Sequence, residues 1–298
     1  MMGPMAPTTQ HPVRLRRSTS PTLAALDRGG QMMQRRMRDL TVGSALILAP
    51  AVVANLWATA VAFDRFDPSE GWLPSMSVGS TGVEDVSVWL GVVTVGLATA
   101  LVGFFASQIL LADRFGRHVG LGAALRTTLR RLPAVAWLWL LTHWWVPLVT
   151  WGVVTSPDGG AGLAFLLLPA AWVASSFTLL SVPIMVGEAI GPLAAARRAF
   201  RLARMRFGAC GRFVVLSTLL GGGFVLGMAT LAPLLEVTGF VGFGGLLWLV
   251  QGVLVQLGVL LTVPIIATAT AQLYVELRVD AEGLDLVVAA DSAFGVRS

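Results

Sequence analysis

The feature that most constrains this chain is a series of apolar runs, each about 20 residues long or longer. An α-helix needs roughly 20 apolar residues to cross about 30 Å of hydrocarbon. Only 12% of the 298 residues are charged, which is about half the share usual in a soluble domain. Because lipid offers the backbone no hydrogen-bond partners, such runs cross a membrane as helices. The sequence therefore predicts an all-α integral membrane protein.

We expect about six transmembrane helices in a membrane domain that covers residues 40–275. The predicted spans are residues 40–63, 86–112, 132–154, 161–187, 213–235 and 240–275. The last run is too long for one perpendicular crossing. It either tilts, begins with a re-entrant glycine-rich segment at 239–245, or continues into the cytoplasm. In the fifth span, Gly223 and Gly227 form a small-residue face that predicts close approach of another helix.

The two ends of the chain differ from this membrane domain. Residues 1–39 mix Pro, Thr, Ser, Gln and Arg without periodicity, which predicts a disordered basic tail. We favour a plain tail over a twin-arginine export signal, because no apolar core directly follows Arg16 and Arg17. Residues 276–298 form a C-terminal tail. The fourth connection is the segment between the fourth and fifth predicted spans. We expect residues 276–291 of the tail to dock on its arginines, helped by apolar contacts.

The arginines predict the orientation. All 21 basic residues are arginine, and they concentrate in residues 14–38, 114–131 and 197–212. The first, third and fifth connections together hold only Arg65. Under the positive-inside rule, the even connections and both termini are cytoplasmic. The absence of lysine is typical of a GC-rich bacterial genome, so we expect the cytoplasmic (inner) membrane of a bacterium.

The formal net charge of +5 raises the question of a partner. Clustered arginines beside membrane spans favour anionic phospholipid headgroups over nucleic acid. The clearest candidate is the segment after the fourth span, where Pro192 suits a first helical turn. Leu193, Ala196, Phe200, Ala203 and Phe207 recur at helical spacing there. We predict an interfacial helix that binds anionic lipid through four flanking arginines, which are Arg197, Arg198, Arg201 and Arg204. The alternative is a solvated basic loop that serves only orientation.

An intramembrane ionisable residue is a candidate functional group, and His143 in the third span is the one such residue. It can relay a proton or bind a substrate, although hydrogen bonding to a neighbouring helix is the more common role. Gln108, Gln251 and Gln256 form the rest of this possible intramembrane polar site. A transport site at Val182-Pro183 and Val263-Pro264, where the fourth and sixth spans kink, is a further alternative.

Motifs of catalysis are missing from the sequence. There is no phosphate-binding glycine loop followed by lysine, no His-Glu-x-x-His and no serine nucleophile elbow. The single cysteine, Cys210, excludes an intramolecular disulfide. We therefore expect no enzyme activity, no cofactor and no metal site.

A faint internal repeat links two basic segments. Residues 120–130 align without gaps on residues 191–201, with identical Gly, Ala and Arg positions. Each segment precedes a pair of spans, which suggests a unit of one basic interfacial helix and two spans, used three times. We place the degenerate first copy at residues 35–40. Chance similarity in a chain rich in Ala, Arg and Gly is the alternative.

The C-terminal half resembles a bacterial membrane-protein family. The residues that carry the resemblance are Val182-Pro183, the run Glu188-Ala-Ile-Gly-Pro-Leu-Ala-Ala-Ala-Arg-Arg-Ala-Phe-Arg-Leu, Val263-Pro264, and Tyr274-Val-Glu-Leu-Arg-Val-Asp-Ala-Glu-Gly-Leu-Asp-Leu. They are similar to the membrane domain of glycerophosphoryl diester phosphodiesterases. In those enzymes a separate soluble domain is catalytic, and we expect none here because the chain ends at Ser298. The resemblance thus implies a membrane scaffold or lipid-interacting partner subunit, with a transporter or permease subunit as the alternative.

Overall fold

The protein is helical throughout the part that can be described. The computed structural model describes residues 20–63, 83–154 and 161–284, with side chains for 20–57, 91–150 and 167–284. No β-strand occurs in these ranges. The prediction of an all-α membrane fold is confirmed.

Within the described ranges, five helical stretches are long and apolar enough to cross a membrane. They are Met37–Trp57, Gly91–Arg114, Leu167–Gly187, Phe207–Val237 and Gly244–Glu282. The third predicted span is occupied by two shorter helices, α5 (Leu132–His143) and α6 (Trp145–Val154), which meet at Trp144. The expectation of about six spans agrees with this arrangement.

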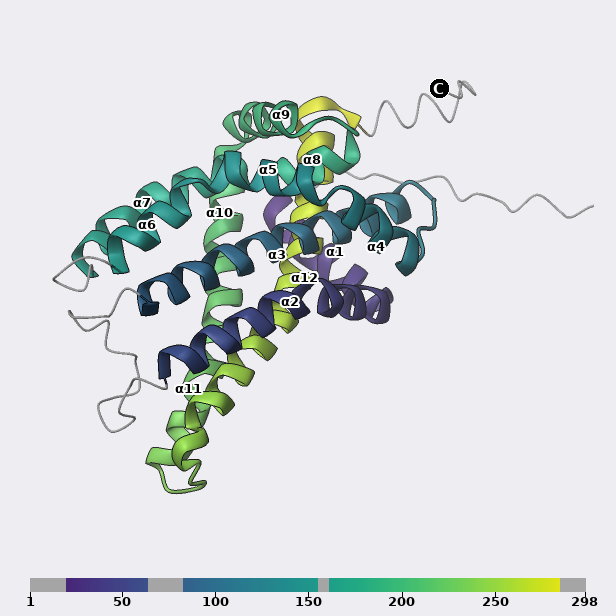
Figure 1. Cartoon of the computed structure of the whole chain (residues 1–298). Helices are drawn as coiled ribbons and strands as arrows, with labels where there is room; N and C mark the ends of the chain where they lie inside the picture. The colour runs from purple at the N-terminus through teal and green to yellow at the C-terminus, as the bar shows by residue number, and fades with distance from the viewer. Residues whose placement is uncertain (1–19, 64–82, 155–160, 285–298) are drawn as a thin grey trace, which may run out of the picture.

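The spans open like a fan (Figure 1). Four short helices gather where the spans converge, namely α1 (Pro21–Arg35), α4 (Leu121–Arg130), α8 (Ser181–Gly187) and α9 (Pro192–Met205). Besides α5 with α6, the spans are α2 (Met37–Phe63), α3 (Val83–Arg114), α7 (Ala161–Thr178) continued by α8, α10 (Phe207–Ser217) with α11 (Gly223–Val237), and α12 (Leu247–Glu282). The tips of the hairpins α6–α7 and α11–α12 point away from each other. Every arginine-rich connection therefore lies at the convergent end.

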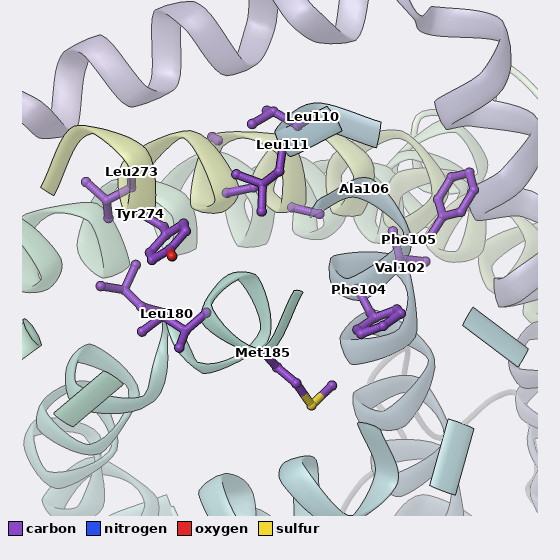
Figure 2. Close-up of a cluster of buried hydrophobic side chains, with 14 of the residues drawn as sticks. Val102, Phe104, Phe105, Ala106, Leu110, Leu111, Leu180, Met185, Leu273 and Tyr274 are labelled. Atoms are coloured by element: carbon purple, nitrogen blue, oxygen red, sulfur yellow. The ribbon is translucent and has the colours of Figure 1, made fainter. Parts of the chain in front are cut away.

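The core lies where α3, α8 and α12 meet (Figure 2). Phe105 and Ile109 of α3, Leu180 beside α8 and Leu273 of α12 are fully buried. Within a bilayer, moving an apolar side chain from lipid into the protein gains little free energy, because lipid tails are also apolar. Close packing therefore holds the helices together. α3 contacts α2, α5, α8 and α12, and its span is the most buried of those in the described residues.

The N-terminal helix α1 overturns part of the predicted disordered tail. Residues 21–35 form a helix whose buried side packs along α12. Pro21 suits the first turn, and Gly29 lets the two backbones approach closely. A Cβ placed on Gly29 would lie 2.6 Å from Ala269 Cα. The prediction was wrong here because the partner that stabilises α1 lies far along the chain, and residues 1–19 fall outside the described ranges.

The structure of α12 distinguishes among the three interpretations of the last apolar run. It is one continuous helix of 36 residues, about 54 Å long, after a short 3₁₀ turn at Gly244–Leu246. The helix continues beyond one membrane thickness and ends at Gly283, whose positive φ of 64° suits a helix C-cap. The predicted docking of the C-terminal tail is confirmed for residues 276–284, where Asp280 and Glu282 pair with Arg206 and Arg198.

The fifth span contains a π-helical turn, Thr218–Gly222. The predicted small-residue face at Gly223 and Gly227 was wrong, because a Cβ on either glycine would meet nothing within 4 Å. The π turn instead presents Gly221 to α12, where its Cβ would lie 2.6 Å from Ile266 Cδ1. Gly258 of α12 forms a separate close contact with α11, where its Cβ would lie 3.3 Å from Val225 Cα. An inserted residue therefore shifts which glycines face the neighbouring helix.

Three repeated units build the fold. Helices α1, α4 and α9, which we call the amphipathic helices, each precede one hairpin of two spans. Each amphipathic helix packs on the unit before it: α4 on α2 and α3, and α9 on α5, α7 and α8. α1 has no preceding unit and packs on α12 of the last one. The predicted threefold use of the unit is thus present, but its first copy is Pro21–Arg35 rather than residues 35–40.

Candidate functional site

Polar side chains concentrate at the convergent end of the fan. We call this region the basic layer and define it as α1, α4, α8, α9 and residues 267–282 of α12. The end of α12 is its axis, and nearly every residue from Ala267 to Val279 is buried. The layer therefore has an inner surface around α12 and an outer surface on the amphipathic helices.

One inner cluster surrounds Glu276, which is only 3% exposed. Arg28 of α1 forms an ion pair with its Oε1 atom. Gln272 donates a hydrogen bond of 2.6 Å to the same oxygen. Arg114 Nη2, at the end of α3, lies 3.9 Å away. A buried carboxylate needs such partners because its desolvation costs several kcal/mol, so Glu276 fixes α1 and α3 against α12.

A second inner cluster joins α9 to the end of α12. Arg198 Nε lies 3.3 Å from Glu188 Oε1, and Arg198 also pairs with Glu282. Arg278 Nε lies 3.0 Å from the other Glu282 oxygen. Tyr274 donates a hydrogen bond of 3.2 Å to Glu188 and accepts one of 3.1 Å from Arg278. The cluster alternates positive and negative groups and leaves little charge unpaired.

The pKa of Arg198 reflects this pairing. Burial alone would lower the pKa of its guanidinium group. The hydrogen bond to Glu282 and the charges of Glu188 and Glu282 outweigh burial, so the pKa is raised above its usual value. Arg198 therefore stays charged.

The chain between α8 and α9 sets the position of Glu188. Ala189 follows it with φ of 52°, in the left-handed region that non-glycine residues rarely adopt. This turn reverses the chain, and α9 then begins at Pro192 after an extended Gly191. The ion pair between Glu188 and Arg198 spans this turn and helps to hold it.

The three amphipathic helices present the same inner face. Ala25 and Gly29 of α1, Ala124 and Thr128 of α4, and Ala195 and Ala199 of α9 are buried, four residues apart in each helix. The first buried Ala in each helix follows another Ala, which is Ala24, Ala123 or Ala194. These small residues allow the helices to lie close to the spans. The equivalence supports a true repeat over chance similarity.

The outer face differs among the copies. On α4, Arg126, Leu129 and Arg130 are exposed. On α9, the equivalent Arg197, Phe200 and Arg201 are exposed, as is Arg204. Leu129 is 65% exposed and Phe200 is 50% exposed. Arginines flanking exposed apolar side chains are typical of a helix that lies at a membrane surface.

The predicted lipid-binding residues fall on two sides of α9. Arg197, Arg201 and Arg204 point outward, whereas Arg198 is held inward by two carboxylates. The predicted apolar face is divided: its Leu193 and Phe200 are about half exposed, whereas its Ala203 is buried against the bundle. Ala195, Ala199 and Leu202 are also buried there. The predicted face did not allow for packing of α9 on other helices.

The predicted intramembrane polar residues do not form one site. His143 lies between the rings of Trp139 and Trp145, with its Nδ1 atom 2.8 Å from Thr142 Oγ1. Gln108 donates a hydrogen bond of 2.9 Å to Thr128 and so ties α3 to α4.

The other two glutamines lie on α12. Gln256 Oε1 is buried without a hydrogen-bond partner among the described residues, and no hydrogen bond joins Gln251 to the other members. The four residues remain separate polar positions.

Sequence reasoning missed Glu188, Tyr274 and Glu276 as members of a site. Tyr274 is the single tyrosine of the chain, and Tyr274, Arg278 and Glu282 recur every four residues. That spacing places polar groups on one stripe of a helix otherwise read as a tail.

In the described parts of the chain, no group of three or more His, Cys, Asp or Glu side chains is positioned to hold a metal ion. No family model, curated protein or solved structure matches this chain. The function is therefore inferred from the geometry of the basic layer.

Proposed function

We propose that this chain is a non-enzymatic membrane scaffold or partner subunit of the bacterial cytoplasmic membrane, and that its basic layer binds anionic phospholipid. The observation that carries the proposal is the outer face of α4 and α9. There, exposed arginines flank exposed Leu129 and Phe200 at the end where the spans converge. A lipid bilayer offers both phosphates and an apolar boundary at this depth.

The arginines on these two helices are sufficient for lipid attraction. The exposed ones are Arg126, Arg130, Arg131, Arg197, Arg201 and Arg204. Each arginine close to an anionic leaflet contributes on the order of 1 kcal/mol before screening. Guanidinium groups also bind phosphate oxygens in pairs, which a point charge does not. Contributions of this size favour retention of anionic over zwitterionic lipid.

The orientation follows from the same residues. With the basic layer on the cytoplasmic side, both ends of the membrane domain face inward and the positive-inside rule is obeyed. Reporter fusions after Arg65, Arg131, Asp158, Arg206 and Ser298 should read out, in, out, in and in. An outward reading after Ser298 would refute both the six-span topology and the placement of the layer.

Lipid binding is tested by native mass spectrometry of protein extracted from bilayers with equal phosphatidylglycerol and phosphatidylcholine. Changing Arg197, Arg201 and Arg204 to Gln should reduce the retained phosphatidylglycerol. The matched change of the same arginines to Lys keeps the charge and should retain most of it. Equal retention by wild type and the Gln variant would show that these arginines only set topology, which would remove the proposal's main support.

A transporter or permease subunit is the second candidate, with a site at the kinked fourth and sixth spans. One observation favours it: Gln256 has a buried, unpartnered oxygen within the sixth span, and such an atom costs about 1–3 kcal/mol unless something binds it. Thermal unfolding with a panel of small polar solutes tests this. A solute that raises the midpoint for wild type but not for Gln256→Leu supports transport. Stabilisation by Gln256→Leu with no solute effect contradicts it.

A further inference from the structure

The repeat allows the outer faces of the three amphipathic helices to be compared position by position. Ala25, Ala124 and Ala195 mark the same buried position in the three copies. The residues two positions later, Asp27, Arg126 and Arg197, are all exposed. The residues six positions later, Gln31, Arg130 and Arg201, are also all exposed. The three helices share their buried positions, which we call the inner frame. They differ in the side chains that they expose.

We propose that the chain carries two equivalent anionic phospholipid sites, one on α4 and one on α9, and that α1 is a copy of the same frame without a site. The inference rests on the proposed lipid binding and adds its stoichiometry and its residues. Each site consists of one arginine pair and one apolar residue. These are Arg126, Arg130 and Leu129 on α4, and Arg197, Arg201 and Phe200 on α9.

The spacing of each site suits one phospholipid molecule. Residues four apart on a helix are neighbours, with about 6 Å between their Cβ atoms. Two guanidinium groups at that separation can bind one phosphate from two sides. The apolar residue lies between them in sequence, one position before the second arginine, and so faces the upper part of the acyl chains.

Aromatic packing fixes the apolar residue on α9. The ring of Phe200 stacks on Phe177 of α7 at 4.6 Å between centroids. Phe177 also contacts the ring of Phe207 at 5.2 Å. Half of Phe200 remains exposed, so the ring is held in place and still offers a surface to lipid.

Helix α1 has the opposite chemistry at these positions. Asp27 stands where the first arginine stands, Gln31 replaces the second, and Gly30 replaces the apolar residue. Gln31 donates a hydrogen bond of 3.0 Å to Asp27 across one turn. A carboxylate repels a phosphate, and glycine offers no apolar side chain. The arginine that α1 does carry in this turn, Arg28, pairs inward with Glu276.

The test counts phosphatidylglycerol molecules retained by the full chain in native mass spectra after extraction from mixed phosphatidylglycerol and phosphatidylcholine bilayers. Wild type should retain two. Arg126→Gln with Arg130→Gln should lose one, and Arg197→Gln with Arg201→Gln should lose the other. An arginine near an anionic surface is worth roughly a five-fold change in affinity, so each pair should weaken its site about thirty-fold.

A gain-of-site variant supplies the converse. Asp27→Arg, Gly30→Phe and Gln31→Arg together should build a third site on the α1 frame, and retention should rise to three. Asp27 and Gln31 are exposed, and a Cβ on Gly30 meets nothing within 4 Å, so the backbone positions are open to substitution. Gly30→Phe alone is the matched control and should leave retention at two.

The outcomes separate this inference from the proposed function. Unchanged retention after removal of both arginine pairs would overturn both. Two results would support lipid binding but overturn the two equivalent sites. The first is retention that falls only when the α9 pair is changed, and the second is retention that does not fall by one whole lipid molecule per pair. A folded triple variant that still retains two lipids would also overturn the equivalence of the frames, and should it not fold, the two pair variants decide.

Discussion

Gly29 and Gly30 form a matched pair that tests how α1 is held. A Cβ on Gly29 would lie 2.6 Å from Ala269 Cα and 2.8 Å from Ala269 N, whereas one on Gly30 would meet nothing within 4 Å. Both substitutions to alanine gain the same helix propensity, about 1 kcal/mol. Because the atoms against Gly29 are backbone, Gly29→Ala must also displace α1 from α12. Overpacking of this kind costs about 1–3 kcal/mol.

The difference between the two variants isolates the contact, since helix propensity cancels. A difference of about 2 kcal/mol corresponds to roughly thirty-fold in the constant for opening α1. Hydrogen exchange of the α1 amides in nanodiscs measures it. We expect exchange about thirty-fold faster in Gly29→Ala than in Gly30→Ala, with α3 unchanged. Equal exchange in the two variants would refute the close α1–α12 contact.

Three further predictions concern stability in thermal unfolding. Arg28→Met should destabilise by roughly 2 kcal/mol because Glu276 loses its closest charge, and adding Glu276→Gln should recover part of that loss; additive effects would show that the pair is not coupled. Tyr274→Phe removes two hydrogen bonds and should cost about 1–2 kcal/mol, so a midpoint equal to wild type would contradict the inner cluster. Gly221→Ala should leave the protein about 1 kcal/mol less stable than Gly223→Ala, because the added methyl must turn the end of the Ile266 side chain aside, whereas Gly223→Ala meets open space; the reverse order would place the π turn elsewhere.

The spans were predictable because their information is local. A run of apolar residues predicts a membrane helix regardless of what surrounds it, and α2, α3 and α12 each cover most or all of a predicted run. The repeat was predicted in part for the same reason. Its copies on α4 and α9 match in sequence, whereas α1 shares with α4 only the identity of Ala24-Ala25-Leu26 with Ala123-Ala124-Leu125. That short match gained meaning once the buried positions could be compared.

The contacts that were missed depend on residues far apart in the sequence. α1 is too polar and glycine-rich to predict as a helix alone, and it is stabilised by α12, about 240 residues later. The direction of Arg198 depends on Glu188 and Glu282, which lie on different elements. The inner face of α9 was missed because hydrophobicity draws attention to Phe200, whereas the residues that pack closely on other helices are Ala195 and Ala199. Small residues are a weak signal in a chain so rich in alanine.

The order of packing in the three units also has a consequence for synthesis. As the ribosome extends the chain, α4 and α9 emerge after the spans on which they pack, so each can dock at once. Among the helices in the described ranges, α1 is made first, yet its partner α12 is made last. Until translation reaches Glu276, Arg28 has no carboxylate to meet. The close contact between α1 and α12 therefore forms only after every other described helix has been made.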